Sequence, residues 1–424
     1  MLLSLLSLAV SVSPAAPVLH PAARQTSDDD VSAFAHAMAA GGDFVLPPGL
    51  SGEPPPPPAG GANLLEVSQY GDLALLKDPD GEWLSEATTH ALQGDVNWVM
   101  GSAAGAFYKN YDDEYDFLTV LMVHDLGMFF AFYQPLANDV KGIGYDMITP
   151  GEVFDQSDNE LQGYIFMNYY GLWSENRAQG RFVFGQEFMH RWGSFVNIDA
   201  PGPDGEPLDE NALLGRDIAH WSYWFNTPNS PMEGNAWLDN TDGTFTVDLD
   251  ATSTYSDLDM YLMGFIGPEV VGPQSLLIVG DAEQADVGKE AASAPEAFSD
   301  LYDGSGRATT VTGTALEFTL DDIIAAEGAR SPTSEESQKT FRMAFLVVLL
   351  ADDEPDAALL DDVDSVRLNF EADWEEDVHG LADLDTTLGE GDAPDWVDPN
   401  APVDTGDSDT AADTETAEKS GCAC

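Results

Sequence analysis

The feature that most constrains the fold is a change of periodicity near residue 181. Three segments before it are rich in aromatic and β-branched residues, which is typical of β-strands: YDFLTVLMV (115–123), MFFAFYQPL (128–136) and LQGYIFMNYYGLW (161–173). The segment that follows, GRFVFGQEFMHRWGSFVNI, has apolar residues at helical spacing instead. The sequence therefore predicts a run of strands followed by a helix with one apolar face.

The connections between these elements can also be predicted. We expect the first two strands to form a hairpin through the short turn HDLG, and WLDNTDGTFTV to form a second hairpin that turns at Asp242-Gly243. FTLDDIIAAEG predicts a strand end that leads into a short helix ending at Gly328. Ser331 and Pro332 have the pattern of a helix start, so SQKTFRMAFLVVLL and its apolar run 343–350 are interpreted as a buried helix.

The two ends of the chain differ in composition from this central part. Residues 1–17 are apolar and end in small residues, as in a secretory signal peptide. Residues 18–62 are rich in Pro, Gly and Ala and predict a linker or pro-segment. Residues 391–424 are strongly acidic and predict a disordered tail that ends in Cys-Ala-Cys. The folded domain is therefore expected at residues 63–390.

Charge and cysteine content narrow the classes of partner and site. The chain has 76 acidic and 15 basic residues, a formal net charge of −61, so nucleic acid and anionic membranes would be repelled. No apolar stretch is long enough to span a bilayer, so no transmembrane anchor is expected. The two cysteines, Cys422 and Cys424, lie in the tail, which leaves the expected domain without disulfides or a cysteine-based zinc site.

The motif with the most chemical content is FGQEFMHRWG (184–193). Its Gln186, Glu187 and His190 have the spacing of His-Glu-x-x-His, in which two histidines one helical turn apart bind zinc and the glutamate polarises the bound water. His190 is therefore a candidate zinc ligand and Glu187 a candidate general base. Gln186 stands at the first ligand position and offers a neutral amide oxygen, which suits zinc less well than an imidazole.

A third ligand has to come from elsewhere in the chain. His220, in GRDIAHWSYWF, is the first candidate, and Asp259, in YSDLDMYLMG, is the second because a carboxylate also completes zinc sites. Methionine-containing turns support the zinc site in metzincins. NSPMEGN around Met232 has that character, and YLMG around Met263 is an alternative.

Several stretches together resemble a group of secreted zincin-type proteins of myxobacteria and their relatives. These are predicted metallopeptidases and typically read His-Glu-Leu-x-His-Arg-Trp at the helix. The stretches occur in one collinear order over roughly residues 100–385: GQEFMHRWGSFV, HWSYWFNTPNSPMEGNAWLDNTDGTFT, YSDLDMYLMGFIGPEV and FTLDDIIAAEGARSPTSEESQKTFRMAF. The resemblance implies a zincin-like α+β fold with a mixed sheet, an active-site helix and a helical C-terminal part. It also implies zinc as the cofactor and a peptide or protein as the substrate, with Gln186 as a departure at a ligand position.

Two acidic stretches are candidates for calcium. LDNTDGT (238–244) lacks the glutamate that ends a calcium-binding loop, so an ordinary turn is preferred there, and the same argument applies to YDDEYD (111–116). The acidic tail resembles the start of the sorting tails on myxobacterial surface proteins. Its two thiols are either a lipidation or processing signal or part of a solvated end.

Three functions are compatible with these patterns. In the first, the protein is a secreted zinc peptidase with Glu187 as the general base, and Tyr255 or Tyr261 stabilises the oxyanion. In the second, Gln186 abolishes turnover, and the cleft of a pseudopeptidase persists as an extracellular or surface binding site. In the third, the protein is a stable surface or matrix component.

Overall fold

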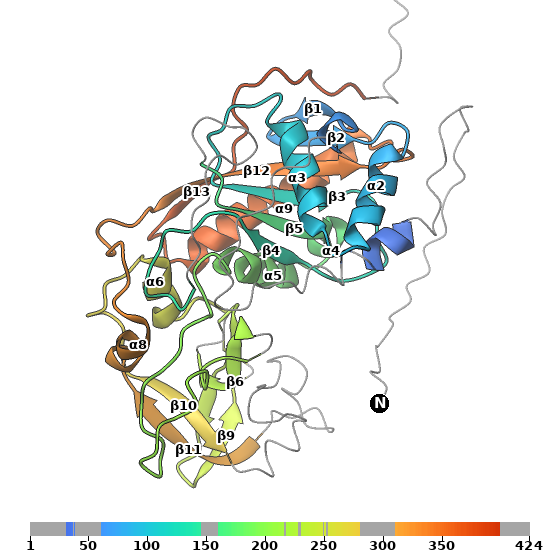
Figure 1. Cartoon of the computed structure of the whole chain (residues 1–424). Coiled ribbons are helices and arrows are strands. Elements are labelled where there is room, and N and C mark those ends of the chain that lie inside the picture. The colour runs from blue at the N-terminus through green and yellow to red at the C-terminus, as the bar shows by residue number, and fades with distance from the viewer. Residues whose placement is uncertain are drawn as a thin grey trace, which may run out of the picture.

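Two β-sheets with surrounding helices make up the fold (Figure 1). The computed structural model describes residues 31–36, 38, 61–145, 160–215, 218–227, 230–248, 250–251, 253–279 and 310–398. The predicted α+β class is confirmed. Within these ranges, none of the helices combines the length and the apolar character that crossing a membrane requires.

The larger sheet is mixed and has the order β1-β2-β12-β3-β5-β4, with β13 added beside β12. The four central strands, β2, β12, β3 and β5, run parallel to one another. Strands β1 and β4 lie at the two edges and run antiparallel to their neighbours. The strands are β1 (Glu66–Tyr70), β2 (Leu73–Lys77), β3 (Phe117–Met122), β4 (Phe132–Pro135), β5 (Gly163–Tyr169), β12 (Thr340–Leu349) and β13 (Asp383–Asp385).

Helices cover both faces of this sheet and create two apolar cores. One core lies between the sheet and the helices α2 (Glu82–Ala91) and α3 (Val96–Phe107), and the other lies on the side of α5 (Arg177–Met189) and α9 (Ala357–Asp377). A short η1 (Gly61–Asn63) packs on α3, and α4 (Gly171–Ser174) precedes α5. Side chains along β12 alternate between the two cores, as strand geometry requires.

Two predictions for this sheet are wrong. Residues 343–349 of the apolar run belong to strand β12 and not to a helix. The strand is buried on both faces, so its sequence lacks the alternation that marks a half-exposed strand. The predicted hairpin through HDLG is not formed either. Strand β5 lies between β3 and β4 and forms hydrogen bonds with both strands. Strand β4, which follows β3 in the sequence, therefore lies on the opposite side of β5 from β3.

The second sheet has the order β7-β6-β10-β11-β9-β8. Its hairpin β8–β9 turns at Gly243 as predicted, and β11 leads into α8 (Leu320–Glu327), which ends at Gly328 as predicted. Helix α6 (Asp257–Met263) lies between the two sheets (Figure 1). The strands are β6 (Trp221–Asn226), β7 (Glu233–Asn235), β8 (Trp237–Asp239), β9 (Thr244–Val247), β10 (Gln274–Val279) and β11 (Thr310–Phe318).

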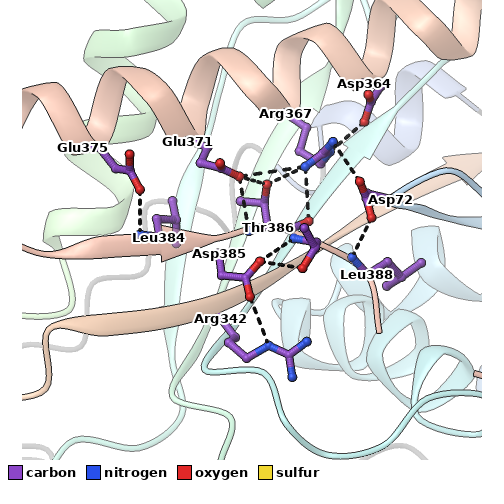
Figure 2. A network of polar contacts seen from close by, with 11 residues as sticks. Asp72, Arg342, Asp364, Arg367, Glu371, Glu375, Leu384, Asp385, Thr386 and Leu388 are labelled. Carbon is purple, nitrogen blue, oxygen red and sulfur yellow. Dashed lines mark hydrogen bonds and ion pairs between the residues drawn. The ribbon is translucent and has the colours of Figure 1, made fainter. Parts of the chain in front are cut away.

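A buried arginine on α9, Arg367, links the C-terminal segment to the rest of the fold. Arg367 donates to Thr386 Oγ1 at 2.6 Å and forms ion pairs with Asp364 and Asp72 (Figure 2). Asp72 also accepts the backbone N–H of Leu388 at 3.0 Å. The turn between β1 and β2, the last helix and the segment after β13 are thereby joined in one network.

Two short segments outside the predicted domain pack against it. The first part of the predicted disordered tail, residues 391–398, packs beside β1, where the Trp396 N–H donates to Gln69 O at 2.7 Å. Residues 31–36, inside the predicted linker, are helical, and fully buried Phe34 lies 6.0 Å from Trp83 between ring centroids. Apolar side chains in each short segment find core partners that composition does not reveal. The predicted signal peptide and residues 399–424 lie outside the described residues.

Candidate functional site

Helix α5 carries the Gln-Glu-x-x-His motif and is fixed tightly to the domain. Its first turn is capped by Asn176, whose side chain accepts the Gln179 N–H at 3.3 Å. Gly180 permits a close approach to α9, since a Cβ there would lie 3.2 Å from the Phe370 ring. The helix ends at Met189, so His190 is its C-cap.

Ion pairs add to the contact between α5 and α9. Arg177 Nη2 lies 2.6 Å from Asp373 Oδ1, and Arg181 Nη2 lies 2.5 Å from Asp377 Oδ1. Glu376 is a second, exposed partner of Arg181 at 3.1 Å. Burial raises the pKa of Asp377 to about 6, although the hydrogen bond and charge of Arg181 oppose this shift. The helix that carries the motif is therefore held by charged groups on one side and by its apolar face on the other.

Three of the predicted site residues meet at the C-terminal end of α5. Gln186 and His190 are buried there, and Gln186 Nε2 lies 3.0 Å from His220 Nε2. The His190 and His220 rings are nearly perpendicular, with centroids 4.9 Å apart. Glu187 is buried on the same turn of the helix. The structure therefore brings together the motif and the histidine that was predicted as its partner.

His220 reaches this point because it immediately precedes β6 of the second sheet. Its backbone carbonyl accepts the Gly215 N–H at 2.7 Å, and the next residue, Trp221, begins β6. In Figure 1, β6 of the second sheet lies below α5. His190 thus caps a helix that packs on the larger sheet, and His220 precedes a strand of the second sheet.

Asp259 is placed differently from the prediction. It is fully buried in α6, where its Oδ2 accepts from the backbone N–H and the hydroxyl of Ser256 and from the Ser230 hydroxyl at 2.7–2.8 Å. Its Oδ1 accepts from Trp221 Nε1 at 2.7 Å. Burial raises the pKa of Asp259, and these hydrogen bonds oppose the shift. The carboxylate is occupied by four donors and positions the segments around His220, so the geometry does not place it as a metal ligand.

Tyr255 and Tyr261, the two tyrosines predicted to stabilise an oxyanion, form hydrogen bonds with backbone groups. The Tyr255 hydroxyl donates to Gly185 O on α5 at 2.6 Å, and burial raises the pKa of this hydroxyl well above its ordinary value. The Tyr261 hydroxyl accepts the Arg330 N–H at 3.1 Å. Both hydroxyls bind backbone groups at these distances, which gives them a structural role.

The turn around Met232 packs against the motif helix. A Cβ on Gly185 would lie 3.5 Å from Pro231, so this glycine allows the turn to approach α5 closely. Met232 is fully buried, and its carbonyl accepts the Trp221 N–H at 2.8 Å. Met263, the alternative, is buried at the C-terminal end of α6. Of the two methionine turns, the one at Met232 is therefore next to the motif.

Sequence reasoning missed Glu233, which follows Met232. Its side chain is 3% exposed, and its Oε1 lies 3.9 Å from His220 Nε2. The only signal in the sequence was an acidic residue inside NSPMEGN, a stretch that had been considered for its methionine alone. The site therefore has a carboxylate on the side of β7 as well as Glu187 on α5.

The donor set fits zinc in its chemistry, although the described residues contain no group of three or more His, Cys, Asp or Glu side chains already arranged to hold a metal ion. His220 Nε2 lies 3.0 Å from Gln186 Nε2 and 3.9 Å from Glu233 Oε1. Two ligand atoms on one tetrahedral zinc are expected to lie about 3.3 Å apart, which falls between these two distances. Rotating the Gln186 amide by about 180° would exchange its nitrogen for its oxygen at this position. Two imidazoles, a carboxylate and an amide oxygen are then available.

Several carboxylates of the two calcium candidates accept hydrogen bonds from the protein itself. In the β8–β9 turn, Asp242 Oδ1 accepts the N–H and the hydroxyl of Thr244, and Asp239 Oδ1 accepts the Thr241 N–H. In the other stretch, Asp116 is buried and accepts hydrogen bonds from two glutamine side chains and a backbone N–H. These carboxylates stabilise turns and strand ends.

Comparison of the chain with protein-family models, with curated proteins and with solved structures gives no match.

Proposed function

We propose that this protein is a zinc-dependent hydrolase of peptide bonds, of the zincin type, in which His190 and His220 bind the metal and Glu187 is the general base. The observation that carries the proposal is the meeting of two segments. The motif lies at the end of α5, which packs on the larger sheet, and His220 lies just before β6 of the second sheet, yet Gln186 Nε2 and His220 Nε2 are 3.0 Å apart. A buried group of imidazole, amide and carboxylate side chains is the composition of a zinc site and is unusual for an apolar core.

The proposal gives each residue of the motif a defined role. Bound zinc would supply a Lewis acid that makes water more acidic and polarises the peptide carbonyl. Glu187 accepts a proton from the attacking water and delivers it to the leaving nitrogen, so one water is consumed and a carboxylic acid and an amine are released. The Gln186 amide occupies the remaining position on the helix face, next to His220.

The edge of the larger sheet supports a peptide as the substrate. Strand β4 is the last strand of this sheet within the described part of the chain, and it packs next to α5. An extended peptide can bind such an edge by adding a strand, with backbone hydrogen bonds that do not depend on its sequence. The net charge of −61 further favours neutral or basic peptides over acidic ones. Secretion is proposed from the composition of residues 1–17.

One observation favours a pseudopeptidase as the second candidate. The Gln186 amide makes a direct hydrogen bond to His220 Nε2, which can satisfy that ring nitrogen without a metal. Histidine at position 186 would instead place two imidazoles one turn apart on α5. In this second function the site binds a peptide or a surface polymer and turns nothing over.

Zinc content and proteolysis, measured together, test the proposal. The full-length chain is used with Cys422→Ser and Cys424→Ser, because thiolates in the tail would bind zinc independently. We expect about one zinc per chain by elemental analysis. We also expect cleavage of casein that a chelator removes, that added zinc restores and that Glu187→Gln lacks. A protein that stays free of zinc and inert in excess zinc, while Gln186→His takes up zinc, would favour the pseudopeptidase instead.

A further inference from the structure

Glu233 is a buried carboxylate next to His220 that the motif does not predict. Its side chain is 3% exposed, and its Oε1 lies 3.9 Å from His220 Nε2. A carboxylate so far from water is costly unless charged or polar groups compensate it. The imidazole of His220 is one such group, and it is also the group that Gln186 contacts. Glu233 therefore belongs to the same buried polar cluster as the motif residues.

The backbone at Glu233 is held in a conformation that L-residues rarely adopt. Its φ is +75°, followed by +74° at Gly234. The carbonyl of Glu233 accepts from Thr227 Oγ1 at 3.0 Å, and its N–H donates to Ser230 O at 3.0 Å. Left-handed conformations at residues other than glycine persist where the surrounding structure enforces them, and they are frequent at binding sites.

Neighbouring groups fix the turn that carries Glu233. Ser230 is bonded to Asp259, which also holds Trp221 Nε1, and Trp221 pairs with Glu233 in the β6–β7 ladder. The residue after His220 and the turn that carries Glu233 are thus connected through one buried carboxylate. Asp259 is a positioning residue whose hydrogen bonds keep the turn next to the imidazole.

We propose that Glu233 is the carboxylate ligand of the zinc site, and that it binds the metal together with His190 and His220. This inference rests on the proposed function and names the ligand that completes it. Two histidines and one glutamate are a donor set that catalytic zinc accepts, with the fourth position open. The Oε1–Nε2 separation of 3.9 Å is about half an ångström longer than that of two ligands on one zinc, a difference within the reach of a side-chain adjustment.

The test is a zinc titration of the full-length chain carrying Cys422→Ser and Cys424→Ser. The protein is stripped with a chelator and titrated with zinc alone against a chromophoric competitor. Glu233→Gln keeps the side-chain volume and removes the charge, and we expect it to weaken zinc binding by more than about 100-fold, beyond the roughly 10- to 100-fold loss that follows a change in a residue behind the ligands. Asp377→Asn is the control, because it removes the charge of a buried carboxylate on α9 that lies outside the site, and its zinc affinity should equal that of the parent.

Each outcome separates the inference from the proposed function. If the parent binds zinc and Glu233→Gln binds it within about 100-fold of the parent, Glu233 is not a ligand, and the proposed function survives with another third donor. If the parent takes up no zinc, both proposals fall. Should Glu233→Gln not fold, Glu233→His decides, because histidine tolerates the left-handed backbone and is itself a ligand. A Glu233→His protein with native circular dichroism that retains zinc supports the assignment, and one that loses zinc overturns it.

Discussion

The Gln186 side chain contacts His220 Nε2 at 3.0 Å, although the two residues are 34 positions apart and belong to different layers of the fold. The residue that departs from the expected motif is therefore in direct contact with the imidazole that the motif needs as a partner. Substitution at position 186 changes both the helix face and the environment of His220, which makes it the most informative position for testing the site.

Gln186→His is expected to strengthen zinc binding by at least about tenfold, because an imidazole is a better zinc donor than a neutral amide. The measurement is a competition titration with zinc in the background lacking Cys422 and Cys424. Gln186→Leu is the control, since it keeps a similar volume without a donor and should bind zinc no better than the parent. Equal affinities for the histidine and leucine variants would contradict the assignment of position 186 to the site.

Glu187→Gln is expected to lower the rate of peptide cleavage by about 10²–10⁴-fold, the usual range for a general base. Zinc content should remain near that of the parent, so the loss would appear in kcat at full metal loading. The measurement is steady-state cleavage of a quenched fluorescent peptide. If the variant retains the parent's rate, the proton is accepted elsewhere.

Asp259→Asn is expected to lower the free energy of unfolding by about 3 kcal/mol, because one carboxylate oxygen becomes an NH₂ group facing buried donors. Urea denaturation followed by tryptophan fluorescence measures this change. Asp257→Asn, exposed on the same helix, is the control and should shift stability by less than about 0.5 kcal/mol. At temperatures where it is folded, the Asp259 variant should still bind zinc. If the folded Asp259→Asn variant binds no zinc, Asp259 is a metal ligand after all.

The Arg181–Asp377 pair should make stability depend on pH in the range below neutrality. The folded-state pKa of Asp377 is raised to about 6, above its ordinary value, so the folded state binds this proton more tightly than the unfolded state. The contribution is present at low pH and is lost as the pH rises through 6. Between pH 7 and 5 the parent should gain about 1 kcal/mol relative to Asp377→Asn.

Unfolding in urea at pH 5 and pH 7 checks this expectation. Glu376→Gln is the matched control, because it removes an exposed partner of Arg181 and leaves the buried carboxylate in place. It should show the same pH response as the parent. Parallel pH responses of Asp377→Asn and the parent would show that this carboxyl does not titrate in the folded state near pH 6.

Part of the site was predictable because it depends on local spacing. The motif spacing correctly predicts a helix through Gln186 and Glu187, although the helix ends at Met189 and does not continue to residue 198 as the apolar spacing suggests. His220 was chosen as the remaining histidine of the central region, and the structure brings it to the motif. The β8–β9 hairpin was predictable for a similar reason, because Asp242-Gly243 favours the required turn.

The remaining features depend on tertiary context. Glu233 points to the site through a backbone with φ +75°, which is enforced by groups from three segments and leaves no mark in the sequence. Asp259 looked like a free carboxylate, but its role follows from Ser256, Ser230 and Trp221, which only the fold brings together. The sequence of strand β12 does not distinguish a strand from a helix, because burial on both faces removes the period that separates the two structures.

His190 caps the end of a helix that packs on one sheet, and His220 immediately precedes a strand of the other. A cation held by both rings would therefore act as a cross-link between the two halves of the molecule. Its affinity would contribute to the cohesion of the whole molecule, so heating the loaded protein would give one sharp calorimetric peak and the stripped protein a broader one. Cleavage by an added protease between the two halves would then increase when the metal is lost, whether or not the protein is itself a peptidase.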